Sequence, residues 1–110
     1  MTTTALDGTN GIIRVFDFQT PVTGFSYTVP AGVVGTVFIP AGTLATGTII
    51  MPATPADGMT VNLSSTQIIT ALTLNANTGQ TIVNAITTLI AGGNAAYLYR
   101  LSNTTWYRVY

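Results

Sequence analysis

The chain has 110 residues, of which only 5% are charged and 47% are hydrophobic, and its net charge at pH 7 is zero. It has three Arg, no Lys and no Cys, so it lacks both the basic surface that nucleic-acid binding needs and the thiols that disulfides need. Its mean hydropathy is positive, at +0.49, but no apolar run approaches the roughly 18 residues of a membrane span, which excludes a transmembrane helix.

The N-terminal stretch MTTTALDGTNG is small and polar and contains two turn-forming pairs, Asp7-Gly8 and Asn10-Gly11. It has neither the basic region nor the apolar core of a signal peptide, so we expect no secretion by that route. Its composition predicts an extended arm or a disordered tail.

Residues 12–18, IIRVFDF, predict a strand with apolar residues on both faces. One face carries Ile12, Arg14, Phe16 and Phe18, and the other carries Ile13, Val15 and Asp17. Two interpretations remain open. Residues 1–18 are an arm that orders only against another subunit's sheet edge, or residues 12–18 are the first strand of the β-domain that residues 19–110 form. In the first case the residues of the first face are candidates for an interface.

Three prolines follow at intervals of ten to twelve residues, Pro30, Pro40 and Pro52, each between an apolar residue and an alanine. Proline fixes φ and donates no hydrogen bond, which excludes long helices and favours strand ends. The apolar residues near the prolines alternate in period two, and they are Tyr27, Val29, Val37, Ile39, Ile49 and Met51. Strands and turns at this spacing are typical of an all-β sandwich or barrel.

Two further strands are predicted after the turn Asp57-Gly58. Their inward residues are Met59, Val61, Leu63, Ile69, Leu74 and either Ala71 or Leu72. The next stretch, residues 81–93, also fits a helical face, but its threonines and other β-branched residues favour short strands, which we predict.

The last segment predicts a hairpin from about Ala95 to Tyr110, because alternating residues flank the turn SNTT. Its first strand places Tyr97, Tyr99 and Leu101 on one face. Aromatic residues are enriched at interfaces and also stack on sugars. The interface candidates here are Tyr97, Tyr99, Trp106, Tyr107 and Tyr110. The alternative is that they pack across the hairpin strands, where period two lets only one face be core.

No catalytic, cofactor-binding or metal site is predicted, so we expect a protein that is not an enzyme. The chain has no His, Cys, Lys or Glu, and its serines therefore have no evident base to activate them. Zinc lacks its usual ligands, and the three aspartates, Asp7, Asp17 and Asp57, lack calcium-loop spacing and are expected to be solvated or salt-bridged. The glycine runs GVVG and AGGN lack the lysine of a phosphate loop.

Residues 56–110 carry a pattern in which a DG turn leads into a strand, an Asn-x-Gly-Gln-Thr-Ile segment follows, and a hairpin ends near Trp-Tyr. The matching residues are Asp57, Gly58, Asn77, Gly79, Gln80, Thr81, Ile82, Asn103, Thr104, Trp106 and Tyr107. On these residues the chain resembles a small β-module of bacteriophage virion proteins, found especially in tail fibres and head-decoration proteins.

The resemblance implies a non-enzymatic, β-rich virion component that is often trimeric. Tail fibres are usually long, whereas this chain starts with Met and ends at residue 110, so we expect a free-standing capsid decoration or cement protein on the particle surface. Its partners would be copies of itself, the major capsid protein or other virion subunits. The alternative is a tail-fibre tip or knob whose aromatic residues hold a host glycan.

The composition agrees with assembly, because an apolar surface that few charges interrupt normally meets other protein. The predicted fold is all-β, with a single-domain β-sandwich or jelly-roll-like architecture and an extended N-terminal arm, although a short barrel is also compatible. The predicted oligomer is a homotrimer.

Overall fold

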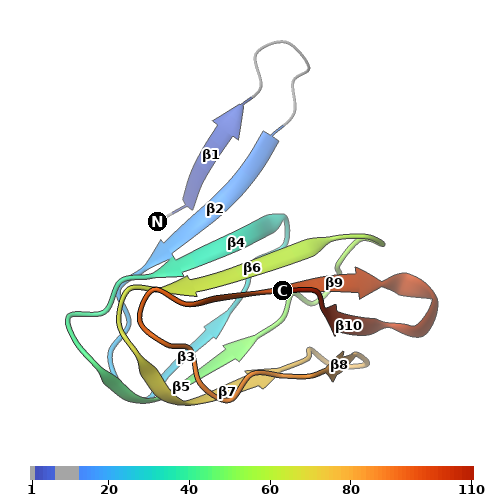
Figure 1. The fold of residues 1–110 in the computed structure, drawn as a ribbon. Helices are drawn as coiled ribbons and strands as arrows, with labels where there is room; N and C mark the ends of the chain where they lie inside the picture. Colours follow the sequence, from blue (N-terminus) through green and yellow to red (C-terminus); the bar gives the residue numbers. More distant parts are fainter. Residues whose placement is uncertain (1, 7–12) are drawn as a thin grey trace.

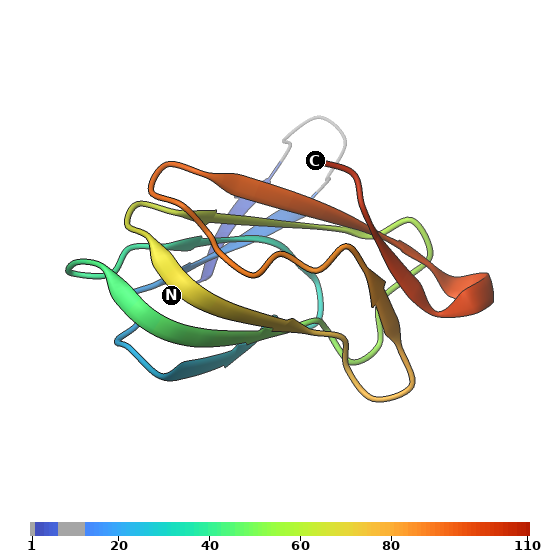
Figure 2. The ribbon, with the colours of Figure 1, turned by 60° about the horizontal axis from the view of Figure 1, so that its bottom comes forward.

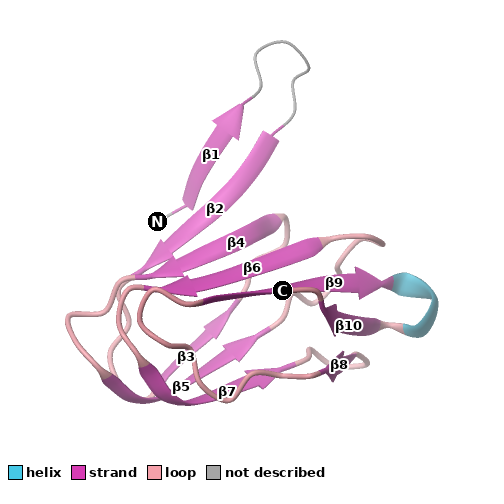
Figure 3. Ribbon diagram, viewed as in Figure 1, coloured by secondary structure: helices cyan, strands magenta, loops and turns pink. Residues whose placement is uncertain are grey.

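The computed structural model describes residues 2–6 and 13–110, which form strands and one turn of 3-10 helix (Figures 1 and 3). The strands are β1 (Thr2–Leu6), β2 (Ile13–Gln19), β3 (Phe25–Thr28), β4 (Val33–Phe38), β5 (Leu44–Ile50), β6 (Thr60–Ser65), β7 (Ile69–Asn75), β8 (Thr81–Val83), β9 (Asn94–Arg100) and β10 (Thr105–Arg108). No α-helix occurs in these ranges, so the predicted all-β class is confirmed. The ambiguous residues 81–93 contain strand β8 and a bridge between Leu89 and Ile69, as the short-strand prediction requires.

The strands form two sheets that pack face to face (Figure 2). The large sheet has seven strands in the order β1-β2-β4-β6-β9-β10-β8, and the small sheet has three in the order β3-β5-β7. This is the predicted sandwich. Its connections differ from those of a jelly roll, whose strands are antiparallel, because β2, β4 and β6 run parallel to one another, as do β3, β5 and β7.

Strands β2 to β7 alternate between the two sheets in chain order, so the chain winds through both sheets in coils. Each coil contributes one strand to each sheet, and the next coil stacks its strands beside the previous ones. We call residues 13–75 the wound half. Residues 77–110, which cover its C-terminal end, are the cap.

The prolines mark the corners of the coils. Pro30 and Pro52 lie where the chain leaves the small sheet for the large one, and Pro40 lies where it returns. The parallel ladder continues to the residue before each proline: Val29 N donates to Ile50 O at 2.9 Å and Met51 N to Asn75 O at 2.9 Å. It stops there because proline has no N–H to donate.

The alternating residues Val37 and Ile39 lie on the outward side of the chain at β4. Phe38 is fully buried, whereas Val37 is half-buried and Ile39 is exposed. The register with β2 shifts at this strand, since Val15 lies opposite Val33 but Phe16 lies opposite Gly35. The extra residue makes a bulge, and a shift of one residue exchanges the inward and outward faces of all that follows.

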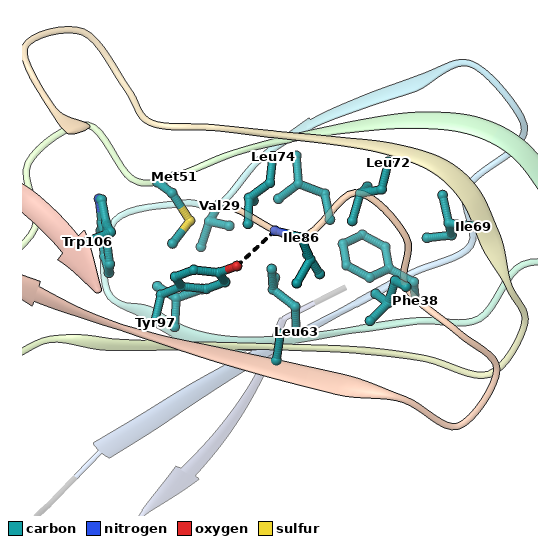
Figure 4. Close-up of a cluster of buried hydrophobic side chains, with 14 of the residues drawn as sticks. Val29, Phe38, Met51, Leu63, Ile69, Leu72, Leu74, Ile86, Tyr97 and Trp106 are labelled. Atoms are coloured by element: carbon teal, nitrogen blue, oxygen red, sulfur yellow. Dashed lines mark hydrogen bonds between the residues drawn. The ribbon is translucent and has the colours of Figure 1, made fainter. Parts of the chain in front are cut away.

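The core lies between the two sheets and extends from the wound half into the cap (Figure 4). The inward residues predicted for β6 and β7 are buried, with Leu72 rather than Ala71 facing the core; they are Val61, Leu63, Ile69, Leu72 and Leu74. Met59 is half-buried and packs against this cluster. The two strands therefore have the predicted faces.

The Tyr97 hydroxyl lies inside the core and joins it to the cap (Figure 4). It accepts a hydrogen bond from Ile86 N at 3.0 Å and donates one to Asn84 O at 2.7 Å. Burial raises the pKa of Tyr97, so the phenol stays protonated and able to donate. One side chain thus fixes the segment between β8 and β9.

The predicted C-terminal hairpin is confirmed, with β9 and β10 antiparallel and a 3-10 turn, η1 (Leu101–Asn103), between them. Leu101 was expected to share one face with Tyr97 and Tyr99, but it begins the turn and is exposed, whereas the two tyrosines are buried. Residues 84–91, which precede the hairpin, run along the edge of β7 that no other strand of the small sheet occupies. There Leu72 N donates to Thr87 O at 2.9 Å.

Strand β1 pairs antiparallel with β2, from Thr2 opposite Asp17 to Leu6 opposite Ile13. The second half of β2 also pairs with β4, so residues 13–19 belong to the sheet of their own chain. The β1–β2 pair projects away from the two-sheet body (Figure 1). Whether residues 1–18 also act on another subunit stays a prediction.

Candidate functional site: the outer face of the large sheet

The outer face of the large sheet is mostly uncharged over its described side chains. Its residues alternate with the buried ones along each strand. They include Phe16, Phe18, Val37, Asn62, Ser64, Ala96, Leu98 and Tyr107, and the charged Arg100 lies at the end of this face on β9. Phe18 and Leu98 are each 38% exposed. This mixture of aromatic, aliphatic and amide side chains is typical of a surface that binds protein or sugar.

A groove of about 300 Å³ crosses this face between β2 and the C-terminal tail. Phe16 and Tyr110 line its two borders, and Asn62, Ser64 and Asn94 contribute polar groups between them.

Gly35 makes the groove possible on the β2 side. The ring of Phe16 lies over it, and a Cβ at Gly35 would stand 2.9 Å from two carbons of that ring. Because Gly35 lies directly opposite Phe16 in the ladder, the glycine lets the ring lie flat against the sheet.

Tyr110 is positioned by the backbone that follows β10. Val109 N donates to Ala96 O at 2.8 Å, and the Arg108 Nε donates to Tyr110 O at 3.0 Å. The Tyr110 side chain itself is 70% exposed. Its ring is therefore held near the groove and is open to a partner.

The predicted interface residues fall into three groups. Phe16, Phe18, Tyr107 and Tyr110 lie on the outer face of the large sheet or on its groove, as an interface requires. For Tyr97, Tyr99 and Trp106 the interface prediction is wrong, because they are buried between the sheets and only the cross-strand packing alternative fits them. Ile12 lies outside the described residues, and Arg14 lies in β2 with its side chain outside the description.

Gln80, from the Asn-x-Gly-Gln pattern, connects the cap to a corner of the wound half. Its Nε2 donates to Pro52 O at 2.8 Å and to Ala53 O at 3.1 Å, while its Oε1 accepts from Trp106 Nε1 at 2.9 Å. Asn77 Nδ2 donates to Met51 O at 3.0 Å. These bonds satisfy the carbonyls that the proline corner leaves without a ladder partner.

The DG turn has a similar structural role at the hairpin tip. The Asp57 Oδ1 accepts a hydrogen bond from Leu101 N at 2.9 Å, and Gly58 N donates to Tyr99 O at 2.8 Å. Gly58 has a φ of +77° and Gly79 a φ of +80°, a region that glycine enters without steric cost. Asp57, Asn77 and Gln80 therefore hold the cap on the wound half, whereas Tyr107, also from the pattern, lies on the outer face.

Asp17 is not solvated, and the alternative expectation, that it is salt-bridged, stays a prediction. It is buried, with only 3% of its surface exposed, and its Oδ2 accepts hydrogen bonds from the Tyr27 hydroxyl at 2.6 Å and Gln19 Nε2 at 2.7 Å. Burial would raise the pKa of Asp17, but hydrogen bonds to the carboxylate act the other way and the pKa is lowered. Burial and the bond to Asp17 raise the pKa of Tyr27, which keeps it a donor.

Several groove residues were missed in the sequence, chiefly Gly35, Asn62, Asn94 and Ala96. Asn62 could have been found, because it alternates with Val61 and Leu63, which the pattern placed together on one face. Gly35 could not, since the bulge in β4 reverses its face.

The described ranges, 2–6 and 13–110, contain no group of three metal-ligating side chains. They also contain no helix long and apolar enough to cross a membrane. The arrangement on the outer face offers stacking surfaces and amide hydrogen bonds, which serve binding. Comparison of the chain with protein-family models, with curated proteins and with solved structures finds no match.

Proposed function

We propose that this chain is a non-enzymatic structural protein of a bacteriophage virion, a capsid decoration or cement protein that assembles as a homotrimer on the head. The observation that carries the proposal is the mostly uncharged outer face of the large sheet, with Phe18 and Leu98 exposed on it. Clustered apolar residues on a surface favour contact with other protein. The virion location and the trimeric state in this proposal come from the resemblance of residues 56–110 to virion β-modules.

The low charge of the chain agrees with this role. Only six residues are charged, and Asp17 is buried. Repulsion between copies is therefore weak, and an isolated soluble monomer would have little net charge to keep it from associating. Attachment through apolar contacts should also persist at high salt, because it does not depend on ion pairs.

Co-sedimentation with phage heads from the same source, prepared without this chain, tests the proposal. We expect the purified chain to sediment with the heads at low and high salt. Leu98→Lys should abolish this, because it places a charge at an exposed apolar position of the outer face. Thr73→Lys, on an exposed position of the small sheet, is the matched control and should bind normally. Heads that leave the wild-type chain in the supernatant would contradict the proposal.

A second function, a fibre tip that binds a host-surface glycan, is favoured by the groove itself. It combines the rings of Phe16 and Tyr110 with the amides of Asn62 and Asn94, and sugars are bound by ring stacking and amide hydrogen bonds. Sedimentation with host envelope fractions separates the two functions. Binding to envelopes that Tyr110→Ala removes, without binding to heads, would favour the tip.

A further inference from the structure

Four strand edges border the two sheets, and they differ in how they are covered. Residues 84–91 cover the edge of β7 through the Ile69–Leu89 bridge and the bond from Leu72 N to Thr87 O. Strand β8 also forms an edge, but it has only three residues, and short edge strands offer few backbone groups to another strand. Strands β1 and β3 are the remaining borders of the large and small sheets, and within the described chain no further strand pairs with either.

Neither open edge carries the features that usually prevent sheet extension. The strand sequences are TTTAL for β1 and FSYT for β3, without a charge or a proline in either. Natural edge strands are normally protected by lysine, proline, bulges or covering segments, because a row of unpaired backbone groups recruits another strand. These two edges are therefore competent to pair with an extended chain.

The end of the core beside β3 also has side chains that an added strand would cover. Phe25 and Tyr27 point inward from β3, are half-buried, and pack against Phe38 at ring-centroid distances of 5.7 and 5.6 Å. Sheets in wound proteins need a terminal element to close such an end. At the opposite end the cap does this, whereas β3 has no equivalent in its own chain's described residues.

We infer that β1 of one copy adds to the edge of β3 of a second copy, so that the large sheet of one subunit continues into the small sheet of the next. The β1–β2 pair projects from the body (Figure 1), which lets β1 reach a neighbour, while β3 lies within the body. The five residues of β1 match the four of β3 in length. Main-chain hydrogen bonds supply the affinity in this mode of binding.

Pairing of β3 with β3 of another copy fits less well. It would bring together the two ends from which the β1–β2 pairs project. Contact between two different edges is instead heterologous, and such a contact closes into a ring when its rotation allows. The inference rests on the self-assembly in the proposed function and states which strands form it.

Cross-linking tests the inference directly, because the chain has no cysteine of its own. Chains with Thr3→Cys or Thr4→Cys are mixed with chains carrying Ser26→Cys or Thr28→Cys and oxidised. Each chain holds one thiol, so every disulfide joins two copies. Paired strands place opposite Cα atoms about 4.5 to 5.5 Å apart, within disulfide reach. Thr81→Cys, on the edge strand β8, replaces the β3 variants as the control.

We expect disulfide-linked mixed dimers for at least one β1–β3 combination and none above background with Thr81→Cys. Light scattering on the wild-type chain separates the possible failures. Oligomers without a β1–β3 cross-link, or with equal cross-linking to Thr81→Cys, would overturn the edge inference and leave the proposed self-assembly intact. A wild-type monomer would overturn both.

A charge on the edge gives a second, independent readout. Ser26→Lys places a lysine at an exposed position of β3, the device by which natural edges resist pairing. The variant should lose the oligomer while its circular dichroism and thermal transition stay as in the wild type. Thr73→Lys, on the same sheet but on β7, should retain the oligomer. Retention of the oligomer by Ser26→Lys would contradict the inference.

Discussion

The wound half and the cap are stabilised in different ways. In the wound half the parallel ladder repeats from coil to coil, and equivalent corners make the same backbone hydrogen bond, from Val29 N to Ile50 O and from Met51 N to Asn75 O. The cap depends on individual side chains, above all Gln80, Tyr97 and Trp106, each of which makes bonds that nothing else in the fold duplicates. Repetition distributes stability over many similar contacts, whereas the cap concentrates it in few.

Replacing a central residue of the cap should therefore have the largest effect. Trp106→Ala removes a fully buried ring and leaves the Gln80 Oε1 without its indole donor. Loss of a buried aromatic side chain costs about 3–5 kcal/mol. Urea unfolding followed by circular dichroism measures the change. Tyr107→Ala, at the next position and half-buried, is the control and should cost much less. Equal losses for the two variants would show that the cap does not depend on Trp106.

In the wound half, a single glycine tests how closely the coils stack. A Cβ at Gly47 would clash with the ring of Phe25, the residue opposite it in the ladder. Gly47→Ala should destabilise by about 1–3 kcal/mol through overpacking, measured by the same unfolding experiment. Gly35→Ala should cost less, because the ring over it lies on the outer face and can move. Gly42→Ala is the control, since a Cβ there meets nothing within 4 Å. A Gly47→Ala variant as stable as Gly42→Ala would contradict the stacking.

The smallest effect is expected at Asp17, whose buried carboxylate joins β2 to β3 through the Tyr27 hydroxyl. The folded-state pKa of Asp17 lies below its ordinary value of 3.8, so its contribution is present above that value and is lost as pH falls through the folded pKa. Asp17→Asn should destabilise the chain near neutral pH, and the difference from wild type should shrink in acid. Urea unfolding of both proteins near neutral pH and in acid measures the difference in their free energies of unfolding. Tyr27→Phe should keep part of the pH dependence, because Gln19 still donates. A stability difference between wild type and Asp17→Asn that grows in acid would contradict a stabilising, ionised Asp17.

The strands themselves could be predicted from the sequence because period-two alternation and the prolines act locally. The buried pairs Val61 with Leu63 and Ile49 with Met51 follow from that alternation. The winding could not be predicted, since closely spaced strands and turns also fit antiparallel hairpins, and parallel pairing joins residues a whole coil apart. Asn62, for example, lies opposite Gly35.

The outer face was only partly predictable for a related reason. Phe16 and Phe18 were identified because β2 alternates regularly. In the hairpin, alternation distinguishes two faces but does not say which one is inward, so Tyr97, Tyr99 and Trp106 could not be separated from Tyr107. Hydrogen bonding decides this in the structure, because Trp106 Nε1 and the Tyr97 hydroxyl both have partners inside.

The burial of Trp106 has a consequence for how the chain folds as it is synthesised. A strand of the wound half can pair only after the strand of the next coil has been made. Folds rich in such distant pairings form slowly. The coils emerge from the ribosome first, but Trp106 reaches the core only after β10 has been made. Until then the inner faces of both sheets are incompletely covered at that end, and nascent chains on neighbouring ribosomes would be prone to aggregate through them.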